Sequence, residues 1–144
     1  MSVLVDIEIR PATSPADVDS VQRLWEGCGL GRAEPDEIDA LMENATTALL
    51  VAMDGQEAIG TAIASFDGWR AYIYHVAVAP RARLSGLGHR LMAEAERYLT
   101  SAGARYVYVT VNQENTEGLA LVAATGYLPE GEIVLTKRLA TRPA

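Results

Sequence analysis

The segment from Val76 to Leu91, VAVAPRARLSGLGHRL, holds the residues of this chain with the clearest chemistry. An apolar run ends at Pro80, arginines follow, and Gly86 and Gly88 stand just before a helical pattern. The first N–H groups of a helix lack internal partners and, with the helix dipole, attract anions. Glycines let a phosphate approach the backbone closely, and arginines add bidentate charge. The segment therefore predicts a site for a pyrophosphate.

Other glycine motifs fit this segment less well. A P-loop requires Gly-Lys-Ser/Thr, whereas His89 and Arg90 follow Gly88. A Rossmann fingerprint requires glycine or alanine where Leu91 stands, and it belongs early in a βαβ unit. A dinucleotide-binding oxidoreductase stays as a third candidate, which fails if neither NAD nor FAD binds. A glycine-rich turn between strand and helix, with no ligand, is the purely structural alternative.

The elements that must position this segment follow the order βααβββαβαβ. This order predicts an α+β (mixed α/β) fold in one domain, residues 1–144, with a mostly antiparallel central sheet and about four flanking helices. The strand–helix–strand step over residues 71–111 predicts one parallel pair, and 105–111 reads as a central strand. We expect strands over 3–12, 71–79, 105–111 and 127–139, a hairpin over 46–66, and helices over 14–29, 35–44, 87–103 and 115–126.

The composition limits the class of protein. With 144 residues, 49% of them hydrophobic and 22% charged, the chain is an ordinary globular domain. It has no apolar stretch that could span a membrane and no basic leader, and Cys28 is alone, so we expect a cytoplasmic protein. Two histidines and one cysteine predict no metal site. The net charge of -7 argues against a nucleic-acid partner.

The spacing Arg83-x-x-Gly86-x-Gly88, after Val-Ala-Val-Ala-Pro, resembles the central motif of the GNAT superfamily of N-acetyltransferases. The element order is similar to that fold along nearly the whole chain. The stretches LWEGCGL, FDGWRAYIYHVAV and GYLPEGEIVLTKRL further resemble a bacterial subgroup of the YpeA type. The resemblance implies acetyl-CoA as co-substrate, no metal, and direct transfer of the acetyl group to a primary amine without a covalent enzyme intermediate.

The resemblance also implies where acetyl-CoA binds. The strand over 72–79 would carry a bulge and separate from the strand over 105–111, and the pantetheine arm would pair with backbone in the gap. An N–H of the bulge would stabilise the oxyanion. Asn115 either lies near the pantetheine or only caps the next helix. The implied contacts are Val76, Ala77, Val78, Arg83, Leu84, Ser85, Gly86, Leu87, Gly88, His89 and Asn115.

The catalytic residues are less clearly indicated. Many family members carry a proton-donating tyrosine where this chain has Val122, and valine cannot donate a proton. Tyr74, and after it Tyr72, could supply the acid or position a water, or both could pack the cleft wall. His75 is expected on the opposite face of a regular strand, in a structural role. Candidate substrate contacts are Asp67, Trp69 and Glu26.

Only the distribution of charged residues along the sequence indicates which molecule accepts the acetyl group. Residues 1–57 hold 12 acidic residues and three arginines, and in GNAT folds the first helices line the acceptor side. This favours a cationic acceptor, such as a polyamine-like molecule, an aminoglycoside-like drug or a protein amine. Val122 favours an alternative, a non-catalytic acyl-CoA-binding or sensing module. The final strand, with a bend at Pro129, leaves room for edge-to-edge pairing into a homodimer.

Overall fold

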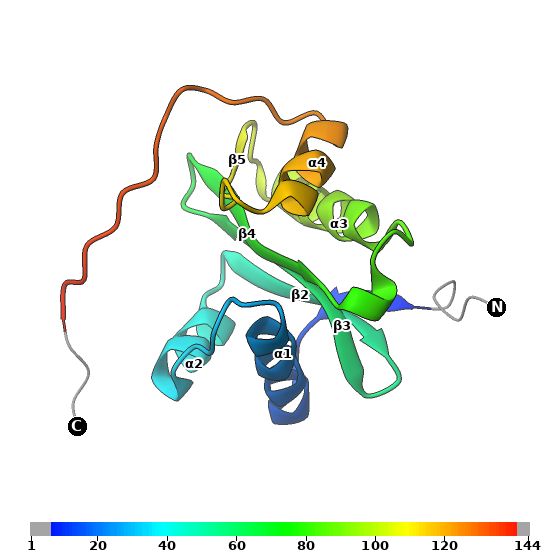
Figure 1. Ribbon diagram of the computed structural model, residues 1–144. Coiled ribbons are helices and arrows are strands. Elements are labelled where there is room, and N and C mark those ends of the chain that lie inside the picture. Colours follow the sequence, from blue (N-terminus) through cyan, green and yellow to red (C-terminus); the bar gives the residue numbers. More distant parts are fainter. Residues whose placement is uncertain (1–6, 141–144) are drawn as a thin grey trace.

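A five-stranded sheet with helices on both faces makes up the body of the protein. The computed structural model describes residues 7–140. The strands lie in the order β1-β2-β3-β4-β5, and only the β4–β5 pair is parallel. Helices α1 and α2 cover one face, and α3 and α4 cover the other (Figure 1). The predicted α+β fold with a mostly antiparallel sheet is confirmed.

The element bounds agree with the sequence patterns along most of the chain. The crossover from β4 through α3 to β5 gives the expected parallel pair. The elements are β1 (Glu8–Pro11), α1 (Pro15–Gly27), α2 (Pro35–Glu43), β2 (Thr47–Asp54), β3 (Glu57–Phe66), β4 (Ala71–Val78), the short 3-10 helix η2 (Pro80–Ala82), α3 (Leu87–Ala102), β5 (Val107–Val109) and α4 (Thr116–Ala124).

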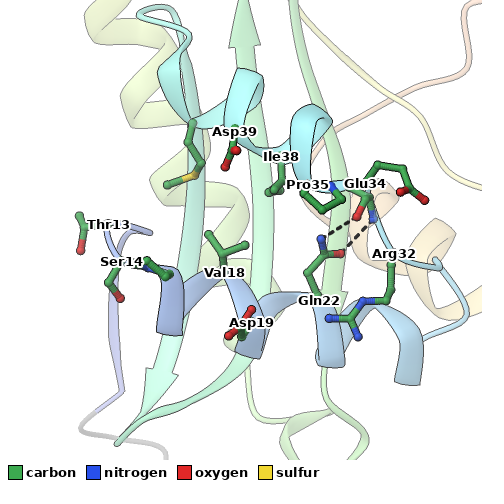
Figure 2. A pocket seen from close by; sticks show the side chains of 13 residues that line it. Thr13, Ser14, Val18, Asp19, Gln22, Arg32, Glu34, Pro35, Ile38 and Asp39 are labelled. Atoms are coloured by element: carbon green, nitrogen blue, oxygen red, sulfur yellow. Dashed lines mark hydrogen bonds between the residues drawn. The ribbon is translucent and has the colours of Figure 1, made fainter. Parts of the chain in front are cut away.

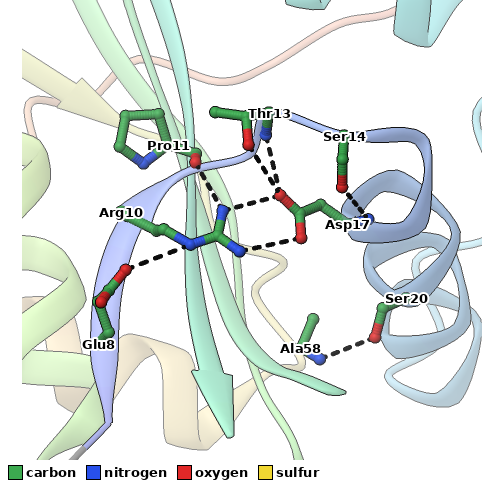
Figure 3. A network of polar contacts seen from close by, with 8 residues as sticks. All are labelled: Glu8, Arg10, Pro11, Thr13, Ser14, Asp17, Ser20 and Ala58. Carbon is green, nitrogen blue, oxygen red and sulfur yellow. Dashed lines mark hydrogen bonds and ion pairs between the residues drawn. The ribbon is translucent and has the colours of Figure 1, made fainter. Parts of the chain in front are cut away.

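A buried carboxylate joins β1 to the start of α1 (Figure 3). The Asp17 carboxylate accepts two hydrogen bonds from the Arg10 guanidinium, at 2.8 and 3.0 Å, and one from the Thr13 N–H at 2.9 Å. The bond from Arg10, followed by the backbone bond, holds the pKa of the Asp17 carboxyl well below its usual range. The Ser14 hydroxyl accepts the Asp17 N–H, which confirms Ser14 as the N-cap.

The core lies between the sheet and the two layers of helices. β2 and β3 are buried along nearly their whole length, as their unbroken apolar runs predict. One face of α3 is fully buried against them, at Leu87, Leu91, Ala95 and Leu99, whose spacing is that of one face of a helix. A Cβ added to Gly60 would lie 2.8 Å from Leu91 Cδ1, so this glycine lets α3 approach the sheet closely.

Two predictions about the end of the chain are wrong. Residues 127–139 form no strand, and β5 is therefore the edge of the sheet instead of a central strand. A strand needs a partner for its backbone groups, and this segment leaves the body without one. The strand predicted over 3–12 is observed from Glu8 to Pro11, and residues 3–6 lie outside the described part.

Asp17→Asn is expected to lower the free energy of unfolding at pH 7 by about 2 kcal/mol, because the buried amide cannot accept the same bonds from the half-buried Arg10 guanidinium. Asp19→Asn, an exposed change of equal charge two residues away, is expected to cost less than about 0.5 kcal/mol. Urea denaturation measures both.

The same pair of variants gives a pH test of this ion pair. The folded-state pKa of Asp17 is depressed, so its contribution is present above about pH 4, the unfolded pKa, and is lost as the pH falls below it. The difference in the free energy of unfolding between the parent protein and Asp17→Asn should therefore become smaller as the pH falls. A difference that stays unchanged down to about pH 2.5 would contradict the stabilising role of the Arg10–Asp17 ion pair.

Candidate functional site

A bulge interrupts β4 in the middle of its pairing with β3. Thr61 pairs with Ala77 and Ile63 pairs with Tyr74, so two residues of β4 lie opposite one residue of β3. His75, one of the two, has a φ of 50°, in the left-handed region that side chains other than glycine rarely adopt. The bulge implied by the family resemblance is therefore present. The strand is not regular at His75, so the expected alternation of faces does not apply there.

A buried hydrogen-bond chain holds the bulge in place. The Trp25 indole N–H donates to the Thr61 hydroxyl at 2.9 Å, and this hydroxyl donates to the His75 carbonyl, also at 2.9 Å. Trp25 and Thr61 are buried, and the Trp25 ring meets the His75 ring edge-on at 5.0 Å between centroids. Sequence reasoning missed this group. Its one local signal is the hydroxyl of Thr61 within the apolar run of β3.

β4 and β5 separate immediately after a short contact. The two strands pair only over Ala71–Ile73 and Val107–Val109, so β5 lies beside only the first part of β4 (Figure 1). From Tyr74 onward, β4 has a strand partner on its β3 side alone. Its other edge can therefore accept an extended molecule through backbone hydrogen bonds.

The segment after β4 forms an open turn before α3. Gly86 is the N-cap residue of α3, with a φ of 86°, and Leu84 has a φ of 61° and is fully exposed. Among residues 7–140, no N-cap side chain bonds to the first turn of α3, whereas Ser14 caps α1 and Asn115 caps α4. A Cβ built on Gly86 would meet nothing within 4 Å. The first N–H groups of α3 therefore face an uncovered surface, as a phosphate site requires.

Gly88 has a different neighbour from Gly86. A Cβ at Gly88 would lie 2.9 Å from Leu121 Cδ2, so this glycine makes room for α4 to pack against the start of α3. The spacing of the two glycines thus serves two purposes. Gly86 leaves a surface open, and Gly88 brings two helices together.

The arginines near this turn are mostly engaged elsewhere. Arg81 bonds to Asp54 at 2.7 Å and Glu57 at 3.1 Å, which ties η2 to the β2–β3 turn. Arg90 donates to a backbone carbonyl at the start of β1. Arg83 stays beside the opening: its Nε donates to the Val78 carbonyl at 3.1 Å and lies 3.8 Å from the Glu117 carboxylate. Arg83 is therefore the arginine of this turn that lies nearest to a candidate anion, and it already has an acidic partner.

The two candidate tyrosines occupy different places. Tyr72 stacks on Tyr108 of β5, with ring centroids 5.4 Å apart, in the paired part of the strands. Tyr74 is half-buried at the point where the pairing ends, and its ring meets the His75 ring at 5.6 Å. Burial raises the pKa of the Tyr74 hydroxyl, so the group stays protonated at neutral pH. Burial also lowers the pKa of His75, which favours its neutral form.

Asn115 and Val122 both belong to α4, Asn115 as its N-cap residue and Val122 within it. The Asn115 side chain accepts the Gly118 N–H at 2.9 Å, so it is the N-cap of α4. Val122 packs against the core and offers no proton. The role of Asn115 toward pantetheine stays a prediction.

The three candidate substrate residues are not gathered at the turn before α3. The Asp67 carboxylate accepts the N–H groups of Trp69 at 2.8 Å and Arg70 at 2.7 Å, and these bonds lower its pKa. Asp67 and Trp69 precede β4, at the end of that strand away from Gly86. Glu26 forms an ion pair with Arg32 at 2.8 Å. Asp67 is therefore a turn-forming residue, and its role toward a substrate stays a prediction, as do those of Trp69 and Glu26.

A hollow of about 530 Å³ lies between α1 and α2 (Figure 2). The Gln22 side chain crosses it, exchanging two hydrogen bonds of 2.9 Å with the Ala33 backbone. Val18 and Ile38 give it apolar walls, and Asp19 lies at its side (Figure 2). No residue of β4 or of the turn before α3 lines it, so this hollow is separate from the gap between β4 and β5.

Residues 7–140 contain neither a metal-binding cluster nor a membrane-spanning helix. No three side chains of histidine, cysteine, aspartate or glutamate there lie close enough together to hold a metal ion. No helix in the same part of the chain combines the length and the apolar content needed to cross a bilayer.

Thr61→Val is expected to lower the free energy of unfolding by about 2–4 kcal/mol, because it leaves the Trp25 N–H and the His75 carbonyl buried without partners. Thr61→Ser keeps the hydroxyl and should recover most of this loss. Guanidinium denaturation of both variants measures the difference. Equal stability of the two variants would show that the hydroxyl does not hold the bulge.

Solved structures share this architecture. An aminoglycoside acetyltransferase, meta-AAC0020, from an uncultured soil metagenomic sample and in complex with sisomicin, is 17% identical, with a TM-score of 0.79 over 97% of this chain and 100% of that one. The aminoglycoside N-acetyltransferase AAC(6')-Iy in complex with CoA is 21% identical, with a TM-score of 0.73 over 93% and 95%. A transcriptional regulator from Bacillus halodurans C-125 is 20% identical, with a TM-score of 0.77 over 92% and 99%. At these identities the likeness shows the fold alone.

The family is shown by a match to the sequence itself. The model of the Acetyltransferase (GNAT) family matches residues 17–127, which include the bulged strand, the turn before α3, and α4. This range covers well over half of the 144 residues. The chain is a member of the GNAT acetyltransferase family.

Proposed function

We propose that this protein is an N-acetyltransferase that moves the acetyl group of acetyl-CoA to a primary amine. The observation that carries the proposal is the gap beside the bulge in β4, which opens next to the uncapped first turn of α3. A strand edge for an extended arm and a cradle for a diphosphate lie at the same end of β4. Coenzyme A carries both chemical groups.

The coenzyme would be held mainly by backbone. The pantetheine arm would bond to the free edge of β4 over Val76–Val78, and the diphosphate to the N–H groups of 83–89. Gly86 fits this role because the surface before it is open and its φ of 86° suits glycine. Arg83 beside the opening would add positive charge, and Asn115 would fix the start of α4 near the arm.

The reaction would be direct acyl transfer. The amine nitrogen attacks the thioester carbonyl carbon, the C–S bond breaks, and the coenzyme leaves as a thiolate that takes up a proton. A backbone N–H at the bulge would stabilise the oxyanion. Tyr74 is the proposed proton donor to the thiolate, because it carries a proton at neutral pH, as tyrosines do, and lies where β4 and β5 separate. The proton lost by the amine would pass to water.

We propose a cationic small molecule as the acceptor. The acidic residues of the first helices favour a substrate with several amino groups, since opposite charges attract. A structural neighbour was solved with the aminoglycoside sisomicin, which fits this class. The YpeA-type subgroup, a bacterial origin, one domain over residues 1–144 and a cytoplasmic location belong to the same proposal.

A binding or sensing module is the second candidate. Val122 favours this second candidate, because valine cannot donate a proton and stands where many family members carry a proton-donating tyrosine. Thiol release from acetyl-CoA with a broad panel of amines, aminoglycosides included, separates the two candidates. Turnover with any amine supports the enzyme. Tight binding of acetyl-CoA with no turnover across the panel supports the module.

Gly86→Ala is expected to weaken the binding of CoA at least about ten-fold, because a Cβ enters the open cradle. Gly103→Ala is the matched control, since Gly103 ends the same helix with a φ of 103° and an open surface. Both changes should cost similar stability, about 1 kcal/mol, from the left-handed backbone. Calorimetric titration that finds equal CoA affinity in the two variants would contradict the cradle.

Tyr74→Phe is expected to lower kcat on the order of ten- to a hundred-fold with little change in the KM for acetyl-CoA, because it removes only the proton donor. Tyr72→Phe, on the same strand and stacked on Tyr108, should keep kcat within about two-fold. Steady-state thiol release measures both. A kcat equally reduced in the two variants would assign the effect to strand packing.

A further inference from the structure

The carbonyl of Val78, at the end of β4, faces the edge of this strand that has no strand partner there among residues 7–140. The N–H of Ala79 belongs to the same trans peptide group and donates to the Ile59 carbonyl of β3 at 2.8 Å. The oxygen and the hydrogen of a trans peptide point in opposite directions, so the Val78 oxygen points away from β3. This carbonyl is therefore one of the acceptors that the free edge of β4 offers to an extended molecule.

Two side chains already occupy this acceptor. The Arg83 Nε donates to the Val78 oxygen at 3.1 Å, and the Cys28 thiol donates to it at 3.7 Å. A carbonyl oxygen has two lone pairs, so both are engaged. Because a thiol is a weak donor, Arg83 is the stronger competitor for this oxygen. An N–H group that arrives along the edge must therefore displace Arg83 before it can bond fully to Val78.

Glu117 helps to hold Arg83 over the edge. The Glu117 carboxylate, in the first turn of α4, lies 3.8 Å from the same Nε atom. Arg83 therefore bridges the end of β4 and the start of α4. The side chains of Arg83 and Glu117 are 40% and 71% exposed, so water and salt weaken their attraction. A more highly charged anion can take the place of the carboxylate.

We propose that Arg83 opens this edge of β4 only to acyl donors that carry a diphosphate. The inference rests on the coenzyme site proposed above. A diphosphate on the turn over 83–89 offers the guanidinium bidentate, charge-assisted hydrogen bonds, which are stronger than one bond to a neutral carbonyl. Arg83 would move to the diphosphate, and the Val78 carbonyl would become free for an amide of the pantetheine arm. Binding of the diphosphate and pairing of the arm are thus coupled through one side chain.

The coupling makes Arg83 a specificity-determining residue. A short thioester with a pantetheine arm and no diphosphate has the same backbone-pairing groups as the coenzyme, but nothing that draws Arg83 away. It must break the bond between Arg83 and Val78 without replacing it, which lowers its affinity. An arginine that only attracted the coenzyme by its charge would not affect the binding of an uncharged arm, so the two roles can be told apart.

Arg83→Met tests the coupling, because methionine keeps an apolar stem and removes both the charge and the donor. Pantetheine, which has no phosphate, should bind this variant at least about three-fold more tightly than the parent protein, since the Val78 carbonyl is free. CoA should bind the variant at least about three-fold more weakly, since the diphosphate loses its guanidinium. Amide NMR titration measures the affinity for pantetheine, and calorimetric titration measures the affinity for CoA.

Arg97→Met is the matched control. Arg97 is an exposed arginine of α3 that pairs with Glu94, so its loss changes the net charge equally and leaves Val78 untouched. Both affinities of this control should stay within about two-fold of the parent protein.

The outcomes separate the role of Arg83 from the coenzyme site itself. If CoA binds the parent protein, the proposal is overturned by a pantetheine affinity that is unchanged or weaker in Arg83→Met, or undetectable in both proteins at millimolar pantetheine. Failure of CoA to bind the parent protein would instead overturn the coenzyme site, and the role of Arg83 with it. Opposite changes in the two affinities, seen in Arg83→Met and absent from Arg97→Met, would support the proposal.

Discussion

The open edge of β4 in this GNAT-family protein depends on one hydroxyl, that of Thr61, which holds the bulge in the strand. Thr61 accepts from Trp25 and donates to the His75 carbonyl, and this carbonyl belongs to a residue with a positive φ. The bonds offset the cost of that backbone conformation. Because β4 is bent here, it leaves β5 after three paired residues. A gap between β4 and β5 follows, and the proposed coenzyme site lies in this gap.

Local signals made most of the fold predictable. The hairpin expected over 46–66 and the helices expected over 14–29 and 87–103 are confirmed, because their signals, the Asp54-Gly55 turn, the Ser14 cap and the four-residue spacing of leucines, depend only on neighbours in the sequence. The Thr61 contacts could not be predicted in this way. Trp25 is 36 positions away from Thr61, and no local pattern pairs an indole with that hydroxyl. The bulge itself was expected only through the resemblance to the family.

The candidate site was predicted in outline and differs in its details. Gly86 is open as expected, whereas Gly88 serves the packing of Leu121. The arginines looked like one cluster in the sequence, but Arg81 is held by acidic residues of the β2–β3 turn. These acidic partners are distant from Arg81 in the sequence, so the sequence pattern does not show that Arg81 is already paired. The prediction of a final strand is wrong for a related reason. Its residue pattern is strand-like, but a strand forms only where the edge of a sheet accepts it. The sequence does not specify that edge.

Amide hydrogen exchange with and without CoA tests the central claim most directly, since that claim concerns backbone groups. Addition of CoA should slow exchange in two stretches, the β4 edge over 76–78 and the turn over 83–89, with little change in α1 and α2. Protection confined to the hollow between α1 and α2, or absent from both predicted stretches at saturating CoA, would contradict it.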